Sequence, residues 1–216
     1  MRFVNRQDAG RRLAYHLTME RLDDVIVIGL PRGGMPVATE VATRLGAPLD
    51  VVVARRLAYP KDPTLGMGAI AEGGMRLIDG DLVARLDITP AQLEGVVADE
   101  ETELHRRVRL YRGTKPPLSV DGRTTILVDD GVATGRIAHA GIEVLRRRGA
   151  AHVVLAVPVG PAETVRRLGG DADDVVCLHT PRSFTSIRQW YTHFPAVHDD
   201  EVATLLATHG TVAGTG

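Results

Sequence analysis

Several features that mark particular protein classes are scarce or missing in this chain of 216 residues. Its one cysteine, Cys177, excludes an internal disulfide and suits a reducing compartment, so we expect a cytoplasmic protein. No apolar run approaches the roughly 18 residues of a membrane span. Residues 1–3 lead into charged sequence without an apolar signal segment, so we expect no membrane association.

Charge of either sign is not in excess, because the formal net charge is only −1. A polyanion would therefore meet no general electrostatic attraction. Helix-turn-helix, zinc-finger and aromatic RNA-binding motifs are also missing, so we expect no nucleic-acid partner. Aromatic residues make up only 4% of the chain, which makes the position of each one informative.

Short apolar runs alternate with helical patterns along the chain. The runs are rich in Val, Ile and Leu and lie at residues 25–30, 49–54, 126–128, 153–157 and, more weakly, 175–178. Continuous apolar strands separated by helices are typical of a parallel sheet that is covered on both faces. The sequence therefore predicts an α/β fold with a central, mostly parallel sheet, in a single domain over residues 1–208.

Residues 79–115 interrupt this alternation and predict a helical insertion. Thr89, Pro90 and Gln92 form a helix-capping sequence, and acidic residues then precede basic ones. This order is typical of a solvated helix face with surface ion pairs. The alternative is a contact between two copies of the chain. At the other end, residues 209–216 are expected to form a disordered tail.

The most informative segment runs from residue 124 to residue 137. A predicted strand is followed by Asp129 and Asp130, by a turn of small residues, and by the start of a helix. Such a turn presents backbone N–H groups and a helix dipole to a phosphate, and two carboxylates accept hydrogen bonds from a pair of hydroxyls. The segment predicts a sugar-phosphate pocket. The alternative is an acidic loop that merely ends a strand.

A second turn, Pro31-Arg32-Gly33-Gly34, follows the first predicted strand. Ligands of open α/β sheets bind at the carboxyl ends of the strands. Both turns are expected at that edge, so two separate motifs point to one crevice.

The segment around Asp129 and Asp130 closely resembles the phosphoribosyl pyrophosphate (PRPP) loop of type I phosphoribosyltransferases. The turn at residues 31–34 resembles the pyrophosphate loop of that family. Residues 66–74 and 189–191 resemble a bacterial branch whose members are assigned to the family by sequence. The resemblance covers roughly residues 3–206 and implies a three-layer α/β fold with a carboxy-terminal hood. It also implies a Mg²⁺-dependent enzyme that moves ribose 5-phosphate from PRPP to a planar nitrogenous acceptor and releases pyrophosphate.

The resemblance gives each part of the PRPP loop a role. Asp129 and Asp130 take the ribose hydroxyls and help to hold Mg²⁺, largely through water. The 5-phosphate lies on the loop that is formed by Gly131, Val132, Ala133, Thr134, Gly135 and Arg136. The sequence departs from the family at Ile137, where a threonine hydroxyl usually holds the phosphate. Arg136 either supplies a charged substitute or faces solvent.

The other implied roles lie outside this loop. Pyrophosphate is assigned to Pro31, Arg32, Gly33 and Gly34, with Arg55 from the end of the second predicted strand. Residues 57–74 resemble the family's mobile loop, in which Lys61 is the only lysine. Trp190 and Tyr191 form the acceptor hood, unless they only pack the carboxy-terminal segment onto the domain.

Two other functions remain open at this stage. A regulatory protein can keep the fold and bind PRPP or a nucleotide without turnover, and water can replace the acceptor in a hydrolase. The intact acidic pair, Arg32 and Lys61 favour the transferase. The acceptor stays unidentified, and the family leads us to expect a homodimer.

Overall fold

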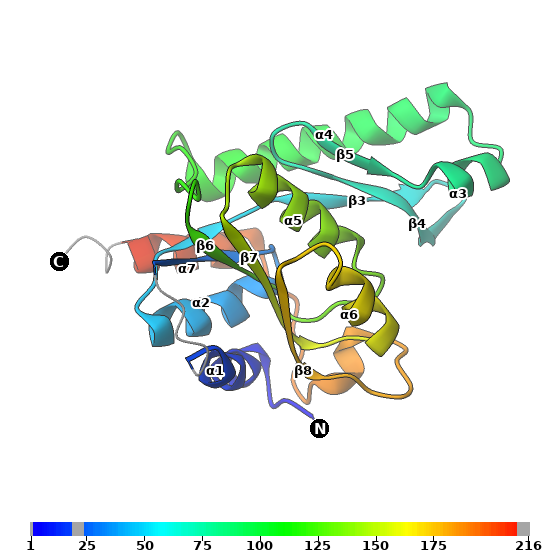
Figure 1. Ribbon diagram of the computed structural model, residues 1–216. Helices are drawn as coiled ribbons and strands as arrows, with labels where there is room; N and C mark the ends of the chain where they lie inside the picture. The colour runs from blue at the N-terminus through cyan, green and yellow to red at the C-terminus, as the bar shows by residue number, and fades with distance from the viewer. Residues whose placement is uncertain (1, 19–23, 211–216) are drawn as a thin grey trace.

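The centre of the molecule is a five-stranded parallel sheet, seen in a computed structural model that describes residues 2–18 and 24–210 (Figure 1). Its strand order is β2-β1-β6-β7-β8, and every neighbouring pair is parallel. The strands are β1 (Val25–Gly29), β2 (Leu49–Val51), β6 (Thr124–Val128), β7 (His152–Val159) and β8 (Asp174–His179). This confirms the predicted α/β class and parallel sheet.

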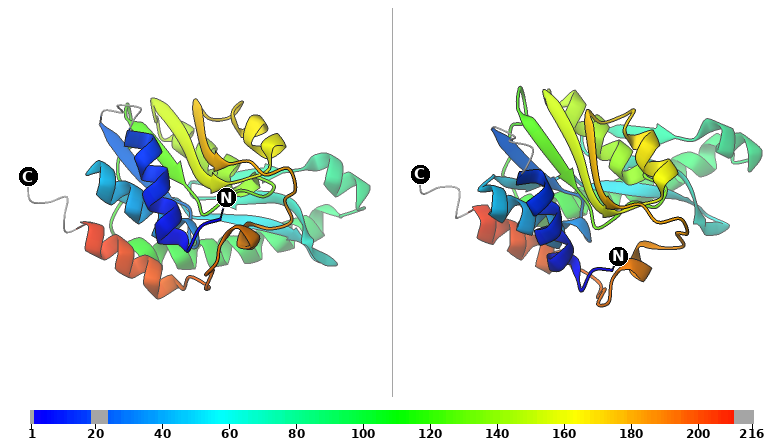
Figure 2. Two further views of the ribbon diagram at one scale, coloured as in Figure 1. Left: turned by 90° about the horizontal axis from the view of Figure 1, so that it is seen from below. Right: turned by 60° about the horizontal axis from the view of Figure 1, so that its bottom comes forward.

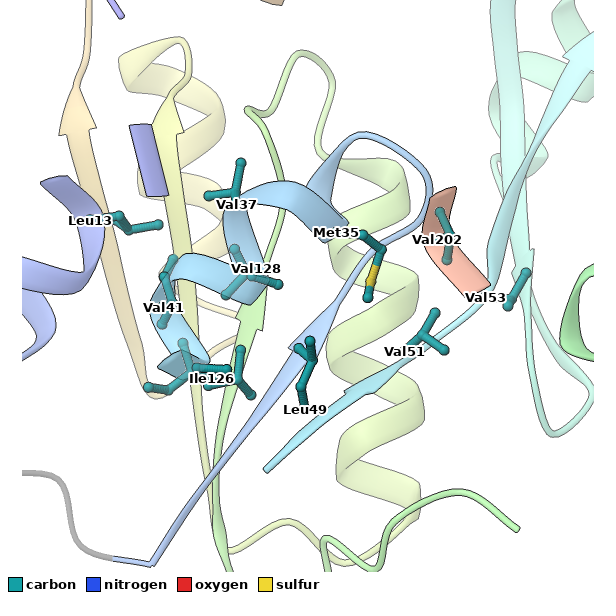
Figure 3. Close-up of a cluster of buried hydrophobic side chains, with 14 of the residues drawn as sticks. Leu13, Met35, Val37, Val41, Leu49, Val51, Val53, Ile126, Val128 and Val202 are labelled. Atoms are coloured by element: carbon teal, nitrogen blue, oxygen red, sulfur yellow. The ribbon is translucent and has the colours of Figure 1, made fainter. Parts of the chain in front are cut away.

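Alternate residues of the strands face two separate cores, because successive side chains of a strand point to opposite faces. On one face, Val27, Ile126 and Val128 pack against α1 (Arg6–Leu17), α2 (Gly34–Leu45) and α7 (Asp199–Gly210) (Figure 3). On the other, Ile28 and Leu127 pack against α5 (Arg136–Arg147) and the end of α6 (Ala162–Leu168). The sheet is therefore buried on both sides, which gives the three layers.

Residues 54–78 form a second, antiparallel sheet rather than a loop. Its strands are β3 (Ala54–Tyr59), β4 (Asp62–Ala71) and β5 (Met75–Ile78), in the order β3-β4-β5. The predicted second strand is correspondingly split, since residues 49–51 join the main sheet and residue 54 begins the small one. Strand β4 needs a glycine at position 68, because a Cβ on Gly68 would lie only 3.1 Å from the carbonyl carbon of Leu77 in β5.

The predicted helical insertion consists of α3 (Gly80–Arg85) and the long helix α4 (Pro90–Arg112), which runs beside the small sheet (Figures 1 and 2). The capping box at Thr89 and Gln92 is confirmed. Predicted ion pairs along the helix also form, for example Arg106 with Glu103 at 2.7 Å. The inner face of α4 buries Leu104 and other apolar side chains in the main core.

Two terminal features differ from the sequence expectation. Helix α1 was not predicted, although its buried residues Ala9, Leu13 and Leu17 recur at helical spacing. At the other end, α7 extends to Gly210, and a ring nitrogen of His209 lies 3.2 Å from the Ala47 carbonyl oxygen. The tail predicted from residue 209 is therefore wrong for residues 209 and 210, and residues 211–216 lie outside the described part of the chain.

A buried polar network joins the insertion to the main sheet. Arg112, at the end of α4, donates to both oxygens of Glu72 at 2.5 and 2.7 Å and to Asp50 at 3.2 Å. Arg148 and the Val53 amide complete the partners of Glu72. The network was not foreseen, because its members are far apart in sequence.

We predict that Arg112→Ala lowers the free energy of unfolding by about 3–5 kcal/mol, because it leaves two buried carboxylates without their shared cation. Denaturant titration would measure the loss. Arg109→Ala is the matched control on the same helix, since Arg109 is exposed, and it should change stability by no more than about 0.5 kcal/mol. Similar values for the two variants would contradict the structural role of the network.

Candidate functional site

The two turns predicted to share one edge lie in contact. Gly29 and Val128 are register partners in neighbouring strands, and the Leu30 amide donates to the Val128 carbonyl at 2.8 Å. A Cβ on Gly33 would overlap the Asp130 carboxylate, and one on Gly34 would lie 2.7 Å from the Val128 oxygen. Glycine is thus required where the first turn approaches the second. The peptide between Pro31 and Arg32 is cis.

Asp130 is buried and held by partners from both ends of the chain. Its Oδ2 accepts a hydrogen bond from Arg6 Nε at 2.8 Å, and its carbonyl oxygen accepts one from the Tyr191 hydroxyl at 2.6 Å. Burial raises the pKa of Asp130, and the charge and hydrogen bond of Arg6 oppose that rise. Sequence reasoning missed Arg6, because nothing in the local pattern links it to a residue 124 positions away.

Asp129 is half-buried, and its Oδ1 accepts a hydrogen bond from the Asp130 amide at 2.8 Å. No cation lies within ion-pair distance of it in the described ranges 2–18 and 24–210. Burial and then the neighbouring charge of Asp130 raise the pKa of Asp129 well above its ordinary value. The site therefore contains one carboxylate with a counter-charge and one without.

Backbone amides gather beside this pair, where the turn enters α5. The N–H groups of residues 133–137 have no acceptor among the described residues. Thr164 and Arg167 of α6 instead bind the carbonyl oxygens of Ala133 and Thr134. The carbonyls of Ala133 and Thr134 are held by α6, and Gly135 is in a left-handed conformation. The turn thus ends in a helix start with free amides, the arrangement that binds anions in other proteins.

Neither predicted alternative for Arg136 fully describes its position. Its Nη2 lies 2.7 Å from Oδ2 of Asp79, which follows β5. That hydrogen bond holds the pKa of Asp79 below its usual range. Ile137 is half-buried and packs against the core beneath α5, so it brings no hydroxyl to the turn.

Arg32 projects from the first turn toward the amino-terminal end of α7. Its Nη1 lies 3.9 Å from Asp199 Oδ1, and its side chain remains 42% exposed. Asp199 also accepts hydrogen bonds from Tyr111 and Arg106, both at 2.6 Å. Arg32 is therefore only loosely paired and accessible to a ligand anion.

Comparison with known protein families assigns the chain to one of them. The family model described as "Phosphoribosyl transferase domain" matches residues 4–189. The chain belongs to the phosphoribosyltransferase family.

The names of similar curated proteins support this family assignment. Two curated Mycobacterium tuberculosis proteins named "putative phosphoribosyl transferase" are 46% identical over 204 residues, which are 94% of this chain and 46% of each relative. The chain thus spans about half the length of these relatives. A uracil phosphoribosyltransferase of Streptomyces avermitilis is 31% identical over 169 residues, covering 76% of this chain and 68% of that protein.

A solved structure supports the same fold. The crystal structure of the protein TT1426 from Thermus thermophilus is 39% identical, with a TM-score of 0.81, and the match covers 96% of this chain and 99% of that one. This chain and TT1426 therefore share one fold, and the family model assigns the fold of this chain to the phosphoribosyltransferases. As for membranes, none of the helices within residues 2–18 and 24–210 has the length and apolarity to span one.

The segment predicted as the family's mobile loop is the hairpin of β3 and β4. Lys61 is exposed at its tip, between the two strands. Arg55, expected at the pyrophosphate turn, lies at 2.6 Å from Glu100 of α4, and Arg56 binds the Pro63 carbonyl across the hairpin. Arg55 is thus paired with Glu100, and its contact with pyrophosphate stays a prediction.

The predicted acceptor hood needs a correction at Tyr191. This side chain is only 1% exposed, packs between Phe3 and Phe194, and uses its hydroxyl on Asp130. Tyr191 is therefore a core residue that supports the acidic pair, and the expectation of a stacking platform there is wrong. Trp190 is half-buried and stands edge-on to His179 at 4.8 Å between ring centroids.

We predict that Asp129→Asn stabilises the free protein at neutral pH. A carboxyl whose pKa is raised on folding destabilises the fold above that pKa, and the penalty disappears as pH falls below the ordinary carboxyl range near about 4. The gain in Tm should therefore be present at neutral pH and shrink on acidification, as measured by calorimetry over a pH series.

The matched variant Asp130→Asn should have the opposite sign at neutral pH, because it leaves Arg6 buried without its partner. Equal shifts in Tm for the two variants would contradict the different environments described for the two carboxylates.

Proposed function

We propose that this phosphoribosyltransferase moves ribose 5-phosphate from PRPP to a planar nitrogenous acceptor and releases pyrophosphate. The observation that carries the proposal is the juxtaposition of a carboxylate pair with unpaired amides at residues 133–137. These groups match the two ends of a ribose 5-phosphate, since amides at a helix start bind phosphate and carboxylates bind hydroxyls. The adjoining turn with Arg32 matches the leaving pyrophosphate.

The reaction is a displacement at C1 of the ribose. The acceptor nitrogen forms a bond to C1 on one face while the C1–O bond to pyrophosphate breaks on the other. The electron pair of the broken bond leaves with pyrophosphate, and the acceptor nitrogen loses its proton to water. Negative charge develops on the leaving group, beside which Arg32 and the Gly33 amide would lie, since the Gly34 amide already donates to the Leu30 carbonyl at 3.0 Å. Catalysis is thus mainly positioning and electrostatic stabilisation.

Mg²⁺ fits the donor set of this site. Asp129 is a carboxylate with a raised pKa and no cation among its described neighbours, and oxygen ligands suit Mg²⁺. The described residues contain no group of three or more side chains able to hold a metal ion, so substrate oxygens and water would complete the coordination. Bound there, Mg²⁺ would neutralise charge on pyrophosphate.

A PRPP-binding or nucleotide-binding protein without turnover is the second candidate function. It is favoured by the burial of Tyr191, which leaves Trp190 as the remaining aromatic residue of the predicted hood. Both candidates require PRPP or a related ribose phosphate to bind. They differ in whether pyrophosphate appears when planar bases are added.

We predict saturable PRPP binding that Mg²⁺ strengthens, and its loss in the double variant Asp129→Asn/Asp130→Asn. Removing two hydrogen bonds to charged groups, each worth about 1.5 kcal/mol or more, should weaken binding at least about 100-fold. Isothermal titration measures this, and pyrophosphate release with a panel of bases then separates enzyme from binder.

The control for the double variant is Asp171→Asn. This change removes a carboxylate that pairs with His139 of α5, away from the acidic pair, and should leave PRPP affinity unchanged. Unchanged PRPP affinity in the folded double variant would show that the acidic pair takes no part in PRPP binding.

We also predict that Ala133→Glu abolishes binding of ribose 5-phosphate. Ala133 is exposed, so the fold should survive, while the added carboxylate places negative charge among the amides that would receive the phosphate. Ala151→Glu, at an exposed position just before β7, is the control. Isothermal titration of each variant with ribose 5-phosphate gives the readout, and equal affinity of the two variants would argue against the amide site.

A further inference from the structure

The small antiparallel sheet and helices α5 and α6 border a cavity of about 280 Å³. Strands β4 and β5 pack against α5 beside it, and α5 in turn packs against the main sheet (Figure 1). Part of the cavity wall is apolar and is formed by Ala69, Leu77 and Ile78. The volume lies just below the range of roughly 300–1,000 Å³ that is typical of small-molecule sites, so the cavity suits a small ligand.

The polar lining of this cavity is mainly cationic. Arg136 and His139 lie three residues apart at the start of α5, so they share a face of the helix, and Arg167 comes from α6. Asp79 brings the carboxylate of the described lining, and Arg136 already binds it at 2.7 Å. Within residues 2–18 and 24–210, Arg167 has no carboxylate at ion-pair distance, and its Nη2 donates to the Thr134 carbonyl instead. The cavity therefore has an excess of positive charge, which Arg167 carries.

His139 adds an unused ring nitrogen to this lining. Its Nδ1 lies 2.6 Å from Oδ2 of Asp171, and an ionised carboxylate only accepts hydrogen bonds, so Nδ1 carries a proton. Nε2 has no hydrogen-bond partner in the part of the chain that the structure describes. A phosphate monoester matches this set of groups, because its charged oxygens accept from guanidinium groups. Its P–OH form, which is present near a pKa of about 6, also donates to a neutral imidazole, and a carboxylate ligand would lack that donor.

The cavity differs from the turn that is proposed to bind ribose 5-phosphate. The turn offers the backbone N–H groups of residues 133–137, whereas the cavity offers side chains. Arg136 belongs to both sets, but its guanidinium is turned to Asp79. The two sites are nevertheless neighbours, since Arg167 binds the Thr134 carbonyl. A ligand in the cavity would therefore contact a side chain that holds the turn in place.

We propose that this cavity is a second anion site, which binds a phosphate monoester with a compact apolar body. Arg167, Arg136 and Nε2 of His139 bind the phosphate, and the body of the ligand lies on the wall that includes Leu77 and Ile78. The excess charge of the lining favours an anion, and the apolar wall favours an ester over free phosphate, because the ester removes apolar surface from water. The inference goes beyond the proposed transferase and does not require the chain to bind PRPP.

The probe for the first test is phenyl phosphate, a monoester with a small planar body. In the wild-type protein it should shift the Nε–Hε NMR resonance of Arg167 saturably, with that resonance assigned from its absence in Arg167→Lys. Inorganic phosphate, which cannot use the apolar wall, should bind more weakly. The shift should persist in Ala133→Glu, because position 133 is outside the cavity lining. No saturable shift in the wild type, or its loss in folded Ala133→Glu, would overturn the proposal.

A charge placed on the apolar wall provides the second test. Ile78 is 38% exposed, so Ile78→Glu should fold, and its carboxylate should pair with the guanidinium groups of the cavity. Phenyl phosphate should then bind at least about 10-fold more weakly, the equivalent of one hydrogen bond to a charged group. Ile78→Gln, which has the same size as the Glu variant but no charge, should keep most of the affinity.

Leu65→Glu is the matched control for the added charge. Leu65 is 39% exposed on the same sheet and is outside the cavity lining, so this variant should bind phenyl phosphate as the wild type does. Equal affinity of Ile78→Glu and Leu65→Glu would overturn the proposal. A protein that binds phenyl phosphate in the cavity but no PRPP would refute the proposed function and retain this second site.

Discussion

The parallel pairing of β1 with β6 is the constraint on which the site depends. Because Gly29 and Val128 are register partners, the two chain segments that leave the sheet do so side by side. A shift of one residue would turn the buried side chains of a strand to the other face, so the two cores hold this register. Contact between the turns then requires residues without a side chain at positions 33 and 34.

Polar contacts across long sequence distances hold the surrounding elements to this centre. Arg6 joins the amino-terminal helix to Asp130 in the turn after β6, and Arg112 joins the end of the insertion to the buried carboxylates of Asp50 and Glu72. Each is a buried cation with several acceptors, the arrangement in which guanidinium is preferred over ammonium. The same kind of interaction therefore serves the site in one case and the packing of the small sheet in the other.

The acidic pair lowers the stability of the free protein. Burial raises the pKa of both aspartates, and the charge of Asp130 raises the pKa of Asp129 further, so the charged forms are disfavoured in the free protein. A ligand that brings hydroxyl donors, or a cation, would relieve this cost on binding. Sites of this kind are expected to be less than optimally stable.

The sequence by itself determined the fold class, the strands of the parallel sheet and the two turns, but not the small antiparallel sheet. Apolar runs predict buried parallel strands, and small residues with adjacent carboxylates predict a phosphate-binding turn, because both depend on contacts within a few residues. Even the capping of α4 by Thr89 followed from local chemistry.

Only the tertiary structure decided what each site residue touches. It turned Tyr191 from a predicted platform into a buried support, placed Arg55 against Glu100, and brought Arg6 to Asp130. These outcomes rest on packing between elements that are far apart in the chain. A local pattern specifies the chemistry that a residue offers, but the partner that receives it is set by the global arrangement of helices and strands.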